Sequence, residues 1–221
     1  MDIAVHTGSI SVWAVFFMRK MMRRILFCLT LAGIIWCGGL LRDYETVHNE
    51  LIRFHVVANS DAPEDQAVKL KVRDAVIESL EEDLQKIGDV EAAKTYLREK
   101  LPYIQQVAND ALESAGFSPD AAVSLCREAF DTRYYDTFTL PAGVYESLRI
   151  IIGEGAGHNW WCVTFPNLCL PATSEDFADT AVGAGFSEEL TGTLTDRGDY
   201  RIRFFLLDAL GRVENILLGD K

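Results

Sequence analysis

The sequence predicts a single α+β domain, in which an N-terminal strand and two helices are followed by a mainly antiparallel sheet. Residues 51–58 alternate apolar and polar side chains, as a half-buried strand does. Residues 62–115 carry apolar side chains at helical spacing in two stretches, and from residue 121 the period shortens towards two. Several strands after a run of helices are typical of the α+β class.

The first strand is predicted over residues 51–58. Ile52, Phe54 and Val56 point to one side and form an apolar face. Arg53 and His55 point to the other side. We therefore expect one face of this strand in the core and the other at a polar surface.

The first helix is predicted to start just after Asp61 and to run to about Leu84. Asp61 is expected to cap its N-terminus, with Glu64 as the capping-box partner three residues on. Pro63 lies in the first turn, where a missing N–H costs nothing.

The second helix is predicted between Asp89 and Gly116. Its apolar side chains keep helical spacing from Val90 to Ala115. Pro102 lies inside this pattern, so a kink or break is expected near Lys100.

The remaining chain is predicted to supply the other strands of the sheet. Four of them are expected at residues 122–130, 133–139, 147–153 and 159–165. The glycines of 153–157 predict a tight hairpin between the last two. Residues 172–199 are expected to form a loop with short elements. A last strand is predicted at 200–207, with a short helix after it.

A segment near the N-terminus has the pattern of a membrane-targeting sequence. Residues 18–24 hold four cations, and residues 25–41 are uncharged. A helix over 25–41 would span roughly 25 Å, a little short of the roughly 30 Å hydrocarbon core. Residues 18–42 are therefore interpreted as a signal peptide or a signal anchor, and both alternatives stay open. A buried core helix is less favoured, because the run is apolar all round.

The charges around this segment predict its orientation. Cations precede the apolar run, so the N-terminus is expected to stay in the cytoplasm and residues 43–221 to be exported. Residues 1–17 show no pattern with a recognisable role. Met18, Met21 and Met22 are alternative starts. A start at Met18 places the cations at the head of the chain and would leave residues 1–17 untranslated.

The exported part is strongly acidic. The chain has 21 basic and 33 acidic groups, of which residues 1–42 hold five and one. Residues 43–221 thus hold 16 basic and 32 acidic groups, a net charge of −16. Phosphate backbones repel such a domain, so no nucleic-acid partner is expected.

The sequence shows no constellation typical of a catalytic, metal or cofactor site. It lacks the common hydrolase, zinc-protease and phosphate-loop motifs. Its histidines are not at metal-ligand spacing from one another or from cysteine. The glycines of 153–157 precede a strand and not a helix, unlike those of a dinucleotide site. The alternative is a cell-wall hydrolase that uses His55 with Asp61, or Glu154 with His158.

The segment from Gly153 to Cys169 is the most unusual part of the chain. Adjacent tryptophans at 160 and 161 should face opposite sides of a strand, so one is expected in the core and the other at the surface. A hairpin that turns at residues 165–166 would place Cys162 opposite Cys169, at disulfide distance. Export permits this disulfide to form.

Two blocks of the sequence, together with the exported layout, resemble a known family. They are IRFHVVANSDAPEDQAVKLKVRDAV at 52–76 and RYYDTFTLPAGVYESLRIIIGEGAGHNWWCVTFPNLC at 133–169. They resemble the stage II sporulation protein R family over roughly residues 51–170. The acidic stretch 172–199 departs from the resemblance.

The resemblance implies a signalling role and no enzymatic activity. Members of the family are made in the forespore and exported into the space between the two compartment membranes. There they activate a membrane-embedded aspartic protease of the mother cell, which processes the precursor of sigma factor E. Surfaces expected to bind this protease are the polar face of the first strand with the loop after it, and the glycine-rich loop with the tryptophans. Their residues are Arg53, His55, Asn59, Ser60, Asp61, Glu64, Glu154, His158, Asn159, Trp160 and Trp161.

Overall fold

The computed structural model describes residues 12–118, 120–135, 138–165, 181–183, 186, 188–195 and 201–218. It divides the chain into two compact units, residues 1–42 and 43–221. The second unit contains the α+β domain that the sequence predicts.

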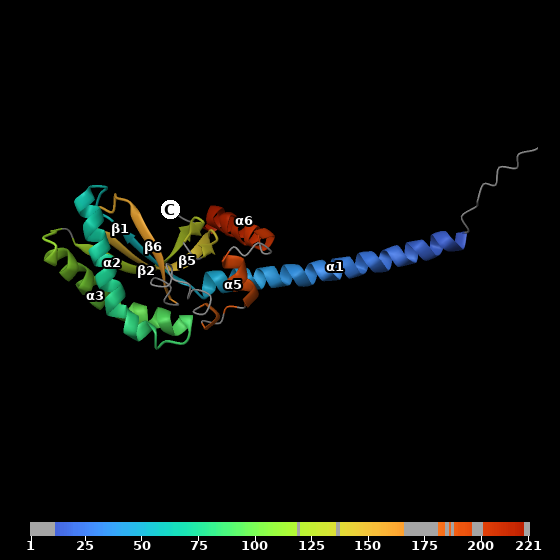
Figure 1. Ribbon diagram of the computed structural model, residues 1–221, viewed down its shortest axis with the longest axis horizontal. Helices are drawn as coiled ribbons and strands as arrows, with labels where there is room; N and C mark the ends of the chain where they lie inside the picture. The colour runs from blue at the N-terminus through green and yellow to red at the C-terminus, as the bar shows by residue number, and fades with distance from the viewer. Residues whose placement is uncertain are drawn as a thin grey trace, which may run out of the picture. The chain divides into compact units, whose positions relative to one another are not determined.

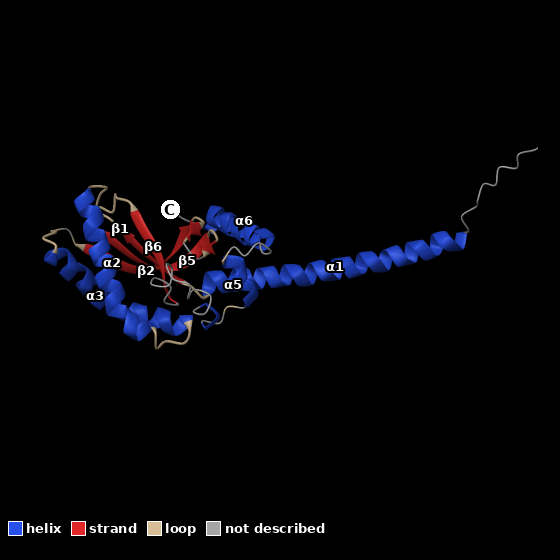
Figure 2. Ribbon diagram, in the orientation of Figure 1, coloured by secondary structure: helices blue, strands red, loops and turns tan. Residues whose placement is uncertain are grey.

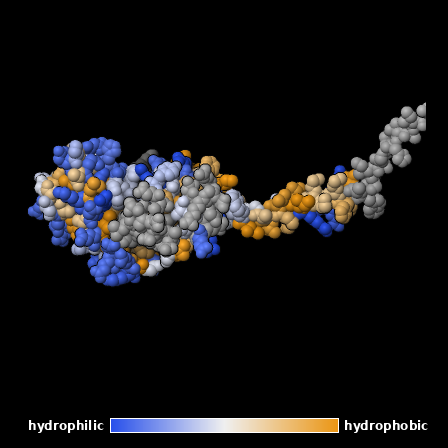
Figure 3. Space-filling view, in the orientation of Figure 1, coloured by the Kyte–Doolittle hydropathy of each residue, from blue (hydrophilic) through white to orange (hydrophobic). Residues whose placement is uncertain are grey.

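The first unit consists of most of one long helix, α1 (Val12–Asn49). Most of its large apolar side chains between Val15 and Leu41 are exposed, Leu40 being buried, and Figure 3 shows hydrophobic residues along this helix. The helix is long and apolar enough to cross a membrane, as judged by length and composition. Its last turns, from Asp43 onward, belong to the second unit.

The second unit is built from the other helices and strands (Figures 1 and 2). Its helices are α2 (Pro63–Leu84), α3 (Val90–Ser114), α5 (Glu188–Leu194) and α6 (Arg201–Leu218). Its strands are β1 (Ile52–Val57), β2 (Ala121–Phe130), β3 (Arg133–Tyr134), β4 (Thr139–Leu140), β5 (Gly143–Ile152) and β6 (Asn159–Phe165).

Four strands form a mixed sheet in the order β2-β5-β1-β6. The outer pairs, β2 with β5 and β1 with β6, are antiparallel, while β1 and β5 are parallel. The predicted α+β class with a mainly antiparallel sheet is thus confirmed. Strands β3 and β4 form a separate two-stranded ribbon in place of the single strand expected at 133–139.

The core lies between the sheet and the helices α2 and α3. Strand β1 contributes Ile52, Phe54 and Val56, all fully buried, as its alternation predicts. Figure 1 shows α2 and α3 together along the sheet. Helix α3 continues through Pro102, which is exposed. At such a site water can bond the carbonyl that proline leaves unpaired, and of the kink or break predicted near Lys100 the break does not occur.

Helix α6 replaces the strand predicted at 200–207. It packs against the ends of β2 and β5, where Leu207 is buried and Gly211 lies against the backbone of Ala142. A Cβ atom at Gly211 would lie only 1.6 Å from the Ala142 carbonyl oxygen. The prediction of a strand was wrong because a short apolar run suits a strand or a helix equally well.

The hairpin predicted around residues 153–157 was also wrong. Strands β5 and β6 are not neighbours, because β1 lies between them. The connection crosses the end of β1, where the Gly157 amide donates to the Ala58 carbonyl and the Ala156 amide to the Asn59 carbonyl. This crossing brings together two loops that are far apart in the sequence.

Candidate functional site

The two loops predicted to bind a partner meet at one place. The loop after β1, residues 58–61, and the loop before β6, residues 153–158, are joined by backbone and side-chain hydrogen bonds. We call these two loops, with Asp65 and Lys69 of α2, the loop junction. Strand order creates it, because β6 returns on the far side of β1.

Both polar atoms of the Asn59 side chain form hydrogen bonds within the loop junction. Its Oδ1 accepts a hydrogen bond from the Glu154 amide at 3.0 Å, and its Nδ2 donates to Asp65 Oδ2 at 2.8 Å. Asn59 therefore has a positioning role, while the Glu154 side chain is free to face solvent, since that residue is exposed.

Asp65 is a buried carboxylate that organises the start of α2. It also accepts a hydrogen bond from Ser60 Oγ at 2.6 Å, and Ser60 Oγ accepts one from the Ala62 amide at 3.1 Å. The N-cap residue of α2 is Ala62, which makes no side-chain cap. The predicted Asp61–Glu64 capping box was therefore wrong. Glu64 is exposed in the first turn.

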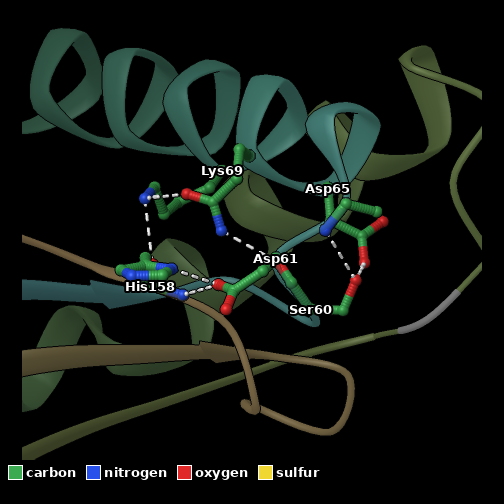
Figure 4. Close-up of polar contacts among 7 residues, drawn as sticks. Ser60, Asp61, Asp65, Lys69 and His158 are labelled. Carbon is green, nitrogen blue, oxygen red and sulfur yellow. Dashed lines mark hydrogen bonds and ion pairs between the residues drawn. The ribbon is translucent and has the colours of Figure 1, made fainter.

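Asp61 contacts His158 across the two loops. Asp61 Oδ1 accepts a hydrogen bond from the His158 amide at 2.6 Å and also contacts His158 Nδ1. Lys69 lies behind this pair and donates to the His158 carbonyl at 2.9 Å and to Gln66 Oε1 at 2.7 Å. Figure 4 shows the contacts of His158 with both Asp61 and Lys69, with α2 above them. The side chains of Asp61 and His158 remain 56% and 80% exposed, so the loop junction presents them to solvent.

The loop junction should lose stability in acid. Hydrogen bonds from Ser60 and Asn59 lower the pKa of Asp65, and a hydrogen bond from His158 lowers the pKa of Asp61. A carboxyl whose pKa is lower in the folded state stabilises the fold above its unfolded pKa and loses that effect as pH falls through the folded pKa. We expect the free energy of unfolding to fall below about pH 4. Urea unfolding measured against pH should show a shallower acid slope for Asp65→Asn than for the unchanged chain. An equal slope would contradict this assignment.

The two tryptophans lie on opposite faces of β6, as predicted, and both are half-buried. Trp160 packs edge-on against Phe54, with ring centroids 5.9 Å apart, and the Arg73 guanidinium lies 4.8 Å from its ring. Trp161 faces the other side, where Arg133 stacks on it at 3.3 Å. Trp160 therefore supports the core beneath the helices, whereas Trp161 belongs to a polar surface.

That polar surface is the side of the sheet away from α2 and α3. We call the cluster His55, Glu128, Arg133, Arg149 and Trp161 the polar sheet face. His55 Nδ1 lies 3.1 Å from Glu128 Oε2, and Arg149 donates to Glu128 Oε1 at 2.9 Å. Burial alone would raise the pKa of Glu128, but these contacts hold it below its ordinary value. Glu128 is therefore a carboxylate shared by two basic side chains.

The polar sheet face has hydrogen-bond donors that the described parts of the chain do not satisfy. A cavity of about 100 Å³ is lined by His55, Glu128, Phe130, Arg133 and Trp161, among others. Within the described ranges, three buried N–H groups there lack an acceptor, those of Arg133 Nε, Arg149 Nε and Trp161 Nε1, and His55 Nε2 has no hydrogen-bond partner. Buried donors are nearly always paired in folded proteins. This face therefore has unused capacity for an acceptor group.

Arg53 does not form part of a surface, in contrast to the prediction. It is fully buried, with Nε donating to the Cys162 carbonyl at 3.3 Å and Nη2 to the Tyr135 hydroxyl at 3.1 Å. Its guanidinium also lies over the rings of Phe130 and Tyr145, at 4.4 and 5.2 Å. Arg53 lies on the polar side of β1, but aromatic side chains cover that side at this position.

The structure pairs the candidate acid and base residues differently from the hydrolase alternative. His55 contacts Glu128 and not Asp61, and His158 contacts Asp61 and not Glu154. The hydroxyl of Ser60 is the group in the loop junction that could act as a nucleophile. It donates a hydrogen bond to Asp65. Across the described residues, no group of three or more His, Cys, Asp and Glu side chains is placed to hold a metal ion.

The predicted disulfide stays a prediction. Cys162 is buried in the core beneath the helices. Cys169 lies outside the described residues. Asn159, the last of the candidate residues, is exposed at the start of β6.

Sequence reasoning missed Glu128, Arg133, Arg149, Asp65 and Lys69. The alternation along residues 122–130 places Glu128 on one face of a strand, but only the order of the strands in the sheet shows that its side chain can reach His55 and Arg149. Asp65 and Lys69 lie four residues apart on α2, so they share a face, and that spacing was the available signal.

Comparison with known proteins decides the family. A model of the family described as stage II sporulation protein R matches residues 48–175, more than half of the chain. The chain belongs to the stage II sporulation protein R family. Stage II sporulation protein R of Bacillus subtilis (strain 168) is 37% identical to it over 123 residues. That alignment covers 56% of this chain and 55% of the relative, so the chain spans about half the relative's length. No solved structure matches the chain.

Membership in the stage II sporulation protein R family supports a role in sporulation. The matched residues run from the end of α1 through β6, and they contain the loop junction and the polar sheet face. Helix α6 lies outside them. The part of the chain that the family shares is thus the part that builds the candidate site.

Proposed function

We propose that this chain is an exported signalling protein that activates a membrane-embedded aspartic protease of the mother cell and so triggers processing of pro-sigma-E. It acts by binding and has no catalytic step of its own. The loop junction carries the proposal. It lies within the family-matched residues, is held rigid by buried groups, and presents Asp61, Glu154 and His158 to solvent.

Export from the forespore into the intermembrane space is supported by the N-terminal helix. Helix α1 is apolar between two charged flanks, with its cations on the N-terminal side. A membrane contact through residues 25–41 follows, either transient during signal-peptide cleavage or lasting as an anchor. In both cases residues 43–221 reach the extracytoplasmic face of the receptor protease.

The loop junction is suited to recognise a protein surface because its geometry is fixed before binding. Asn59, Asp65 and Lys69 hold both loops from beneath, so little conformational entropy is lost on docking. The unused donors of the polar sheet face offer partners for carbonyl or carboxylate groups of the receptor. Arg133 and Trp161 line both the cavity of the polar sheet face and a hollow beside Asp61 and His158, so the two surfaces adjoin.

Activation requires a difference in affinity between two receptor states. A ligand shifts a conformational equilibrium only as far as it binds one state better than the other. We propose that the domain binds the active arrangement of the protease more tightly, for instance a dimer. The rigid loop junction suits this task, since it cannot adapt to both states.

A double variant of the loop junction tests the proposal. Asp61→Ala/His158→Ala removes the exposed pair and should abolish pro-sigma-E processing, because the receptor contact is lost. The matched control is Glu82→Ala/Lys86→Ala, which removes an exposed ion pair at the C-terminal end of α2 with a 2.7 Å contact. Processing is measured by immunoblot in sporulating cells, with the level of the exported protein measured in parallel. Normal processing by the loop-junction variant at a normal protein level would refute the assignment of this surface.

A further inference from the structure

Helix α6 has large apolar side chains on the side that faces away from the domain, where a surface helix normally carries polar ones. Its exposed side is formed by Ile202, Phe205, Leu210, Val213, Ile216 and Leu217. At 3.6 residues per turn these six positions fall within an arc of about 140°. We call them the apolar face of α6. Ile216 is 82% exposed and Ile202 73%, so this face is open to solvent along the helix.

The side of α6 that faces the domain carries polar side chains beside the buried Leu207 and Gly211. Asp208 accepts a hydrogen bond from the Ala142 amide, Glu214 accepts one from the Val144 amide, and Asn215 donates to the Phe130 carbonyl. A helix of a soluble domain normally buries its apolar side and exposes its polar side. The arrangement in α6 indicates that an apolar medium covers its outer side. Large exposed apolar surfaces of this kind mark interaction sites.

The contacts of α6 indicate which medium this is. Arg203 forms an ion pair with Asp43, and the Tyr44 hydroxyl donates to Glu214 at 2.6 Å. Asp43 follows the apolar run 25–41 by two residues, which is at most about 7 Å of chain. Helix α6 is therefore bound to the part of the domain that directly follows the candidate membrane segment.

The charge of α6 fits the same medium. The helix has three arginines against Asp208 and Glu214, a net charge of +1, within a domain whose net charge is −16. Arg212 lies at the edge of the apolar face, and its side chain is 58% exposed although its guanidinium bonds Asp208 and Thr132. The rest of the acidic surface is repelled by anionic lipid, and α6 is not.

We propose that the apolar face of α6 lies in the outer interface of the membrane from which the chain emerges. The helix would lie parallel to the bilayer plane, with its apolar side among the acyl chains near the headgroups. This surface differs from the loop junction and lies outside the family-matched residues, so the inference is independent of the proposed receptor.

Photo-cross-linking of the full chain tests this inference. Benzoylphenylalanine is placed at Phe205 or Ile216, about 16 Å apart along α6, and the protein is reconstituted in phosphatidylcholine nanodiscs. The control position is Tyr103, an exposed aromatic residue of α3. Mass spectrometry should find phospholipid adducts at both α6 positions and none above background at Tyr103.

Two other outcomes would overturn the inference. Cross-linked dimers in place of lipid adducts would show that a second copy of the chain covers the apolar face. Absence of adducts at both α6 positions would show that the face stays in water. A failed receptor assignment would leave the lipid adducts unchanged, so the two proposals can fail separately.

Discussion

Replacing Phe54 with alanine should lower the free energy of unfolding by about 3–5 kcal/mol. Phe54 is fully buried at the centre of the core and packs edge-on against Trp160. It lies on β1, which β5 and β6 hold on both sides, so the backbone cannot move in to fill the cavity. The measurement is urea unfolding of the full chain in mild detergent, followed by circular dichroism.

Phe205→Ala is the matched control, because it removes the same atoms from a site that is 68% exposed. It should change the free energy of unfolding by no more than about 0.5 kcal/mol. An equal loss in both variants would mean that Phe54 does not lie in a close-packed core.

Gly157→Ala should disrupt the loop junction and abolish pro-sigma-E processing. A Cβ atom at this position would lie 2.2 Å from the Ser60 carbonyl oxygen, which is backbone and cannot rotate away. The loop before β6 would have to move off the end of β1 and lose the hydrogen bond from Gly157 to Ala58. Such overpacking costs about 1–3 kcal/mol.

Hydrogen exchange and processing are both measured for this variant. The amides of residues 156 and 157 should exchange faster, while amides of β1 and β5 stay protected. Gly88→Ala is the control, since a Cβ atom there meets no atom within 4 Å. Faster exchange combined with normal processing would show that signalling does not need the geometry of the loop junction.

The parts of the fold that depend on local pattern could be predicted from the sequence. The alternation of β1 and the helical spacing of α2 and α3 each carry their own signal. The predicted strand at 200–207 failed because the run is short and its apolar residues suit either period. Only the buried Leu207 and Gly211, four residues apart against the sheet, show that the helical period is the one used.

Single residues of the candidate site could be predicted from the sequence, but the contacts between them could not. Asn59, Asp61 and His158 were each named, but in two separate loops. Consecutive strands are usually neighbours, so the sequence favoured a β5–β6 hairpin. The insertion of β1 between them depends on contacts between residues far apart in the sequence. It places the loop after β1 beside the loop before β6, so that Asp61 contacts His158. The prediction that Arg53 lies at a surface was wrong for a related reason. Alternation assigns a side chain to one face of a strand, but it does not show whether other residues cover that face.

The central position of β1 also determines when the domain can form. This strand is made first and is paired on both sides by strands that end at residues 152 and 165. Closing these long loops is costly and slow compared with the local pairing of α2 with α3. If residues 43–221 cross the membrane with residue 43 first, the domain therefore lacks its complete four-stranded sheet until about residue 165 has passed. The loop junction, which needs the end of β1 and the start of β6, would be complete only at the end of that passage, so a partly exported chain could not signal early.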